Sequence, residues 1–312
     1  MVLTYVALTV INRQWGGDHS EAASHARDGL LVLIDWKAAA VCGTLPMDSP
    51  TGLYFGQNAL LVASMYGNFI NVLARGAARW YGLNHPLFSD LHTIHPTRQG
   101  ILVVSSGIDG ILEFTPAMDL VWSWSATHHG YHTLGDGRLR WTDPRFSYSH
   151  VVSRLAMQTT HVNSAIATSD TSLSATFFFQ GIVASIDKRT GATRSLVTGL
   201  DRPHALHRYG PGFVVADTGA NAIVLLDERF HILRVVDLDC NWLQDVAPLP
   251  DGTLAVVDAN NTRIIHLGLR PTGTFDVLRE IRYDRTWKGF ALCPVPLEWE
   301  PHLLPIFREV EY

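Results

Sequence analysis

Cysteine is scarce in this chain, and its scarcity excludes two kinds of scaffold. The three cysteines, Cys42, Cys240 and Cys293, are odd in number and form no CxxC pair. They therefore indicate neither a disulfide framework nor a thiolate zinc site, and we expect them to be small residues of the core.

Charge and long apolar runs are also lacking. Charged residues make up only 17% of the chain, the net charge is −5, and the basic residues are scattered. The sequence therefore offers no positive patch, and we expect neither nucleic acid nor a membrane surface as a partner. The apolar stretch at the N-terminus lacks the basic flank of a signal peptide and is too short to span a bilayer. We expect a cytoplasmic protein whose oligomeric state the sequence leaves open.

What the chain does contain is an internal repeat, and a fixed period decides the architecture of a protein. The segment that begins at His204, HALHRYGPGFVVADTGANAIVLLDERF, aligns without gaps on segments that begin at Asp245, His92 and Thr51. Each copy has a short strand, a turn, an apolar run, a Gly/Asn turn, a second apolar run and a fourth strand. Four antiparallel strands per repeat are typical of a propeller blade.

Two further blades complete the ring. A more divergent copy begins near His161, and the last blade combines both ends of the chain. YVALTVIN, GLLVLID and AAAVCG supply its second to fourth strands, and WKGFALC from Trp287 supplies the innermost one. The sequence therefore predicts an all-β fold: one six-bladed β-propeller over residues 1–312, closed by pairing of the N- and C-terminal segments, which removes free sheet edges.

The runs FVVADTGANAIVLLD and LAVVDANNTRIIHL resemble the blade pattern of the NHL-type propellers. Propellers of this kind include peptidyl-hydroxyglycine lyases, strictosidine-synthase-like and lactonase-like enzymes, aryl sulfotransferases and pure binding modules. The resemblance therefore implies the architecture and leaves the function open.

One repeat position, taken from every blade, forms a ring around the propeller channel at the mouth where the innermost strands begin. That position is held by His204, His92, Asp245, Thr51 and Trp287 and, in a shifted register, by His161. Neutral imidazoles that converge from separate strands suit a catalytic divalent metal. His95 and His207 lie three residues further along their strands, so by the strand period of two we expect them to pack between blades.

We expect His92, His161 and His204 to bind one divalent ion, with Asp245 as a fourth ligand or the general base. The sequence does not distinguish zinc, iron, copper and manganese, and it leaves room for a structural calcium ion. The lyase of peptide amidation is similar, because it is a six-bladed propeller whose metal is held by histidines from different blades. The alternative is that these histidines only bind water or the backbone of a neighbouring blade.

Two long insertions, residues 13–28 and about 125–155, fall in connections that return to the same mouth, and they predict a lid. His128, His129 and Tyr131 are the candidate catalytic residues of this lid. Five candidates for substrate binding come from the insertions and the inner strands: Trp15, Arg140, Gln158, Asn163 and Trp287. The alternative is that the aromatic residues of the insertions only cap the propeller core.

The leading hypothesis is therefore a metal-dependent lyase or hydrolase that acts on a small molecule at the channel mouth. A metal bound by three histidines would also permit oxidation chemistry. The alternatives are a metal-free transferase that resembles the aryl sulfotransferases, and a non-catalytic propeller that binds a ligand or a peptide.

Overall fold

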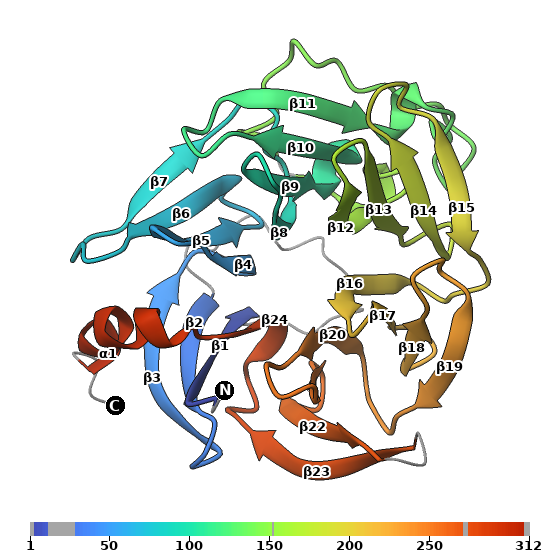
Figure 1. The fold of residues 1–312 in the computed structure, drawn as a ribbon. Helices are drawn as coiled ribbons and strands as arrows, with labels where there is room; N and C mark the ends of the chain where they lie inside the picture. Colours follow the sequence, from blue (N-terminus) through green and yellow to red (C-terminus); the bar gives the residue numbers. More distant parts are fainter. Residues whose placement is uncertain (1–2, 12–28, 152, 271–273, 309–312) are drawn as a thin grey trace.

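A computed structural model describes residues 3–11, 29–151, 153–270 and 274–308. Six four-stranded antiparallel sheets radiate from a central channel, as Figure 1 shows along the channel axis. The predicted six-bladed propeller is confirmed. None of the helices in the described ranges is long and apolar enough to cross a membrane.

Five blades are continuous in sequence, and each is named here by its innermost strand. From the inside outward, their strands are β4 (Pro50–Phe55), β5 (Ala59–Ser64), β6 (Phe69–Ala74) and β7 (Tyr81–Asn84); β8 (Leu91–Pro96), β9 (Ile101–Ser105), β10 (Gly110–Phe114) and β11 (Leu120–Ser125); β12 (Val162–Ser169), β13 (Ser172–Phe177), β14 (Ile182–Asp187) and β15 (Thr193–Val197); β16 (Pro203–Tyr209), β17 (Gly212–Asp217), β18 (Ala222–Leu226) and β19 (Ile232–Asp237); and β20 (Leu243–Pro248), β21 (Leu254–Asp258), β22 (Arg263–Leu269) and β23 (Phe275–Arg282).

The sixth blade joins the two ends of the chain, as predicted. Its strands from the inside outward are β24 (Lys288–Pro294), β1 (Tyr5–Ile11), β2 (Gly29–Asp35) and β3 (Ala40–Met47). β24 runs antiparallel to β1, with Leu292 opposite Leu8 and Pro294 opposite Val6. The predicted insertion at residues 13–28 lies outside the described residues, and Trp15 with it.

The core consists of apolar clusters between neighbouring blades. In β17, Phe213 and Val215 belong to the cluster shared with the β12 blade, whereas Val214 and Ala216 belong to the cluster shared with the β20 blade. Both faces of each middle strand are therefore buried. This explains why the second strands read as continuous apolar runs such as FVVAD rather than as alternating patterns.

Short helices complete the fold. After β24 the chain forms the 3-10 helix η5 (Leu297–Trp299) and α1 (Glu300–Arg308). The Trp299 side chain is fully buried, and its indole N–H donates to the Gly56 carbonyl at 2.9 Å. These helices thus pin the closing blade to the β4 blade. The other 3-10 helices within the described ranges are η2 (Ser106–Ile108), η3 (Ala126–His128) and η4 (Leu155–Met157).

Candidate functional site in the propeller channel

The three histidines of the predicted ring do come together. The ring centroids of His92 and His161 lie 4.7 Å apart, and those of His161 and His204 lie 6.4 Å apart. All three side chains are buried, and Phe178 and Phe290 pack against them. The channel is therefore filled by packed rings at the end where the inner strands begin.

Each of these imidazoles has a hydrogen-bond partner at Nδ1. His92 Nδ1 lies 3.1 Å from the Asp90 carbonyl, His204 Nδ1 lies 3.0 Å from the Arg202 carbonyl, and His161 Nδ1 contacts the Gln158 side-chain oxygen. Desolvation, with a smaller contribution from His92, lowers the pKa of His204 to about 3. His204 is therefore neutral at physiological pH.

The geometry does not support the predicted metal centre. Within the described ranges, no group of three or more His, Cys, Asp or Glu side chains is arranged so that it could hold a metal ion. The three imidazoles instead pack edge-on against one another and against the rings of Phe178 and Phe290.

Strand pairing corrects the register predicted for two members of the ring. In the β16 blade, Pro203 pairs with the last residue of β17, and in the β12 blade Val162 pairs with the last residue of β13. The next residue of each inner strand therefore occupies the same repeat position. That residue is His204 in β16 and Asn163, not His161, in β12. In the β20 blade Leu243 pairs with Asp258, which places Gln244 at this position and Asp245 one residue further on. The chain from Pro248 to its partner Leu254 in the β20 hairpin is one residue longer than the chain from Arg208 to its partner Phe213 in the β16 hairpin, and an ungapped alignment cannot detect this difference.

Trp287 also departs from its prediction. It lies just before β24 and packs against the apolar cluster between the closing blade and the β20 blade. Phe290 faces the channel instead, where its ring contacts that of His92. Trp287 is therefore a half-buried residue at the edge of the core, and it does not line the channel cavity.

His95 and His207 point into the channel, contrary to the prediction that they pack between blades. The pairing of β8 shifts between Leu91 and Ile94, and that of β16 shifts between His204 and Leu206. Each shift is a β-bulge, which adds one residue to the inner strand. Residues three apart then lie on the same face, although the regular strand period of two would separate them.

A cavity of about 460 Å³ occupies the channel beyond the histidine rings. It extends from the level of His92 and His204 to the ends of the inner strands, where Pro96, Pro248 and Arg208 line it. The candidate site therefore lies deeper in the channel than the predicted mouth, because packed aromatic rings fill that mouth.

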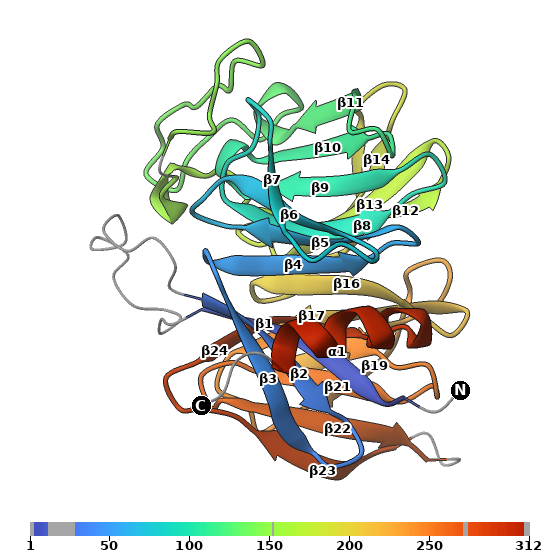
Figure 2. The same cartoon turned by 90° about the vertical axis from the view of Figure 1, so that its left-hand side faces the viewer.

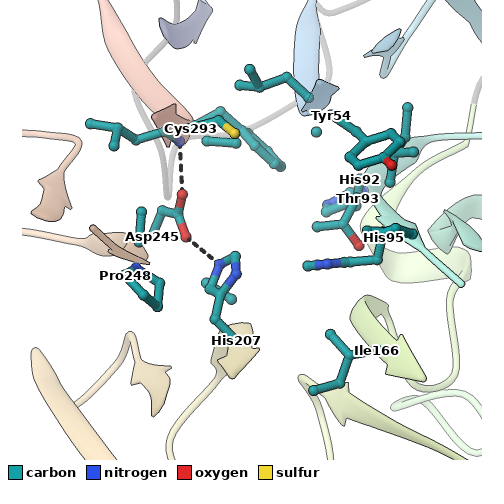
Figure 3. A pocket seen from close by; sticks show the side chains of 18 of the residues that line it. Tyr54, His92, Thr93, His95, Ile166, His207, Asp245, Pro248 and Cys293 are labelled. Atoms are coloured by element: carbon teal, nitrogen blue, oxygen red, sulfur yellow. Dashed lines mark hydrogen bonds and ion pairs between the residues drawn. The ribbon is translucent and has the colours of Figure 1, made fainter. Parts of the chain in front are cut away.

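An imidazole–carboxylate pair lies in the wall of this cavity (Figure 3). His207 Nε2 lies 3.1 Å from Asp245 Oδ1, and Asp245 Oδ2 accepts the backbone N–H of Leu292 at 2.8 Å. The carboxylate is 5% exposed and the imidazole 24% exposed, so the cavity reaches the histidine but hardly the aspartate. Three blades thus hold one acid–base pair, with Asp245 fixing the orientation of His207.

His95 faces this pair, with its ring centroid 5.4 Å from that of His207. Although the His95 ring is partly exposed to the cavity, desolvation and, to a smaller extent, the nearby His207 lower its pKa to about 3. His95 therefore stays neutral and can donate or accept a hydrogen bond, but it is a weak base.

Two other reactive groups line the cavity. Desolvation, assisted by Asp245, raises the pKa of the Cys293 thiol to about 12, and desolvation also raises the pKa of Tyr54. Both side chains stay protonated at neutral pH. Cys293 is therefore a small wall residue and not a nucleophile, because the thiolate is the reactive form.

Two polar groups in the cavity wall, on Thr93 and Asn163, could form hydrogen bonds to a ligand and so orient it. Asn163 Nδ2 and Thr93 Oγ1 are buried and have no hydrogen-bond partner among the described residues. Asn163 Oδ1 accepts from Thr176, which fixes the amide so that its nitrogen is the unsatisfied end. Unsatisfied buried groups are costly in a fold, and they are frequent where a ligand or water binds.

The second insertion lies on the side at which the inner strands begin, at the upper left of Figure 2. It packs over the β4 and β8 blades: Asn68 donates to the carbonyls of Ser149 and Val151, and Arg140 forms an ion pair of 2.6 Å with buried Asp109. Arg140 is thus engaged in the scaffold. Gln158 is the link to the channel, since it bonds to both His161 and Asp90.

The predicted catalytic residues of the insertion do not line the cavity. His128 Nε2 bonds to the Thr142 carbonyl, His129 stacks on Trp124, and Tyr131 packs edge-on against Phe177. Their place in the β8 and β12 blades puts them away from the inner strands. Sequence reasoning missed His207, whose only signal was its recurrence as His95 in a second repeat.

Comparison with known proteins shows the fold and no family. No family model and no curated protein matches the chain. Among solved structures, it is similar to a protein of unknown function from Bacteroides caccae (TM-score 0.60, 12% identity, 94% of this chain and 99% of that one). It is also similar to the periplasmic gluconolactonase PpgL from Pseudomonas aeruginosa (0.56, 14%, 92% and 98%) and to virginiamycin B lyase from Staphylococcus aureus (0.53, 10%, 75% and 70%). The chain thus shares its propeller fold with enzymes and with a protein of unknown function.

Proposed function

We propose that the channel cavity binds a small molecule and that His207 is the general base of a lyase- or hydrolase-type reaction. The observation that carries this proposal is the pair of His207 and Asp245, held between three blades at the wall of the cavity. With Asp245 accepting the Nε2 proton, Nδ1 of His207 keeps its lone pair and can accept a proton. Asp245 then stabilises the imidazolium that forms.

The same pair serves two reactions. In lactone hydrolysis His207 would take a proton from the attacking water and give it to the alkoxide that leaves as the ring opens. In elimination it would take a proton from a carbon next to a carbonyl group, while the bond between the adjacent carbon and a leaving carboxylate breaks. The structural neighbours support these classes, because one is described as a gluconolactonase and another as a virginiamycin B lyase. A metal-dependent reaction at His92, His161 and His204 is the competing proposal.

The test is a substrate screen with matched variants. Aldonolactones, simple lactones and quinupristin are incubated with the protein, and acid release is followed in a pH-stat. Mass spectrometry separates hydrolysis, which adds water, from elimination, which does not. We expect His207→Ala to lower kcat/KM by about 10²- to 10⁴-fold, the usual contribution of a general base.

His231→Ala is the matched control, because His231 and Asp227 form a second imidazole–carboxylate pair, of 2.9 Å, on the exposed outer side of the same blade. It should leave turnover unchanged. Full activity of His207→Ala would refute the proposal. Metal bound to the purified protein, lost together with activity in His92→Ala, would favour the metal-dependent alternative.

A further inference from the structure

A second hollow meets the channel cavity at the far ends of the inner strands. It has a volume of about 270 Å³ and lies between the ends of the β8 and β12 blades. Three residues, Pro96, Ala167 and Arg208, line both spaces and form the rim where they join. A molecule that enters the channel from this end passes Arg208 before it reaches His207.

The charges around this rim leave one cation unpaired. Of the three basic residues in the second hollow, Lys188 is paired with Glu113, and Arg98 with Asp170 at 3.0 Å. Among the described residues, Arg208 has no carboxylate within ion-pair distance. The rim therefore carries a net positive charge that resides on Arg208.

The guanidinium of Arg208 is held in place but not saturated. Its Nη2 donates to the carbonyls of Ala167 at 3.0 Å and Thr168 at 3.4 Å, and its central carbon lies 5.3 Å from the ring centroid of Phe213. A guanidinium has five N–H donors in a fixed fork, so donors remain for a ligand. Nε and Nη1 thus keep their N–H groups, which can donate charged hydrogen bonds to a carboxylate or phosphate oxygen.

We propose that the molecule bound in the channel is anionic, with a carboxylate or phosphate group on Arg208 and an uncharged part that reaches His207. This inference rests on the proposed function of the cavity. The anionic group belongs at the rim because the Asp245 carboxylate would repel it inside, where neutral His95 and His204 offer no compensating charge. The ligand is therefore oriented with its uncharged, reacting end inward.

The experiment measures binding of simple anions at constant ionic strength. Acetate, inorganic phosphate and the neutral analogue acetamide are titrated into the protein, and the imidazole signals of His207 are followed by NMR. We expect saturable shifts with at least one of the two anions and none with acetamide. The tighter anion identifies the class of ligand.

Variants at the rim test the role of Arg208. Arg208→Gln should weaken anion binding by about ten- to hundred-fold, as expected for loss of charged hydrogen bonds, and Arg208→Lys should weaken it less. Arg98→Gln is the matched control and should bind as the wild type does. Thermal unfolding of each variant verifies that it folds.

Two outcomes would overturn the inference: no saturable binding of either anion to the wild type, or unchanged binding in folded Arg208→Gln. Calorimetry on His207→Ala separates this inference from the proposed function. If His207→Ala binds the anion and also keeps full turnover, the anion site at Arg208 is supported and the role of His207 as general base is refuted. If His207→Ala loses turnover while Arg208→Gln turns over and binds like the wild type, the general base is supported and the anion site is refuted.

Discussion

At the scale of single residues, the channel histidines differ in what surrounds them. His204 is buried among aromatic rings, whereas His207 is partly exposed to the cavity and held by a carboxylate. Burial without a compensating charge favours the neutral imidazole. The first kind of histidine stabilises the fold only while it stays neutral.

We therefore predict a loss of stability in mild acid that depends on His204. Its pKa is about 3 in the folded protein and about 6.5 in an unfolded chain. The unfolded chain binds the extra proton between these values, so the free energy of unfolding should fall by about 1.4 kcal/mol per pH unit for this group as the pH drops below about 6.5.

Urea unfolding of His204→Gln between pH 7 and pH 4 measures this contribution as a shallower dependence on pH than in the wild type. His231→Gln provides the control, because the His231 side chain is 73% exposed. Parallel curves for wild type and His204→Gln would show that His204 is not buried as a neutral base.

At the scale of elements, the insertion between β11 and β12 depends on one buried carboxylate. Asp109, directly after η2, is fully buried and accepts the backbone N–H groups of Thr159, Thr160 and His161, each at 2.8 Å, besides its ion pair with Arg140. It thereby fixes the path on which the chain returns to the channel. The insertion is anchored by the blade and is not an independent flap.

We predict that Asp109→Ala lowers the free energy of unfolding by about 3–5 kcal/mol, because it leaves the largely buried Arg140 guanidinium and three backbone N–H donors without their acceptor. Asp136→Ala removes an exposed carboxylate of the same insertion, paired with Arg138, and should cost at most about 1 kcal/mol. Chemical denaturation of both variants gives the comparison. Equal effects would mean that the anchor lies elsewhere.

At the scale of the whole molecule, stability depends on closing the ring. β24, at residues 288–294, is the innermost strand of a blade whose other strands lie within residues 5–47, near the opposite end of the chain. Without it, β1 would be left as an unpaired edge and the apolar faces of two neighbouring blades would be exposed.

We predict that deletion of residues 284–312 abolishes cooperative thermal unfolding, whereas deletion of residues 296–312 only lowers Tm. The shorter deletion keeps β24 but removes α1 and the buried Trp299 side chain, whose loss alone costs about 3–5 kcal/mol. Calorimetry on the two truncated proteins distinguishes these outcomes. A sharp transition in the longer deletion would contradict closure by β24.

The sequence by itself determined the fold, including the closing blade and the meeting of His92, His161 and His204. Blade repeats are local patterns of apolar strands and turns, and their number and order are visible without any contact. Asn163 does line the channel cavity, and its role in substrate binding stays a prediction.

Only the tertiary structure decided where the candidate site lies. A bulge in each inner strand turned His95 and His207 into the channel, and one extra turn residue moved Asp245 to the point where it meets His207. Each of these features shifts the side chains by a single residue. Such a shift cannot be seen in the sequence, because the apolar pattern that identifies a strand is the same with and without it. The pairing of His207 with Asp245 also joins neighbouring blades, so it exists only once the blades have packed.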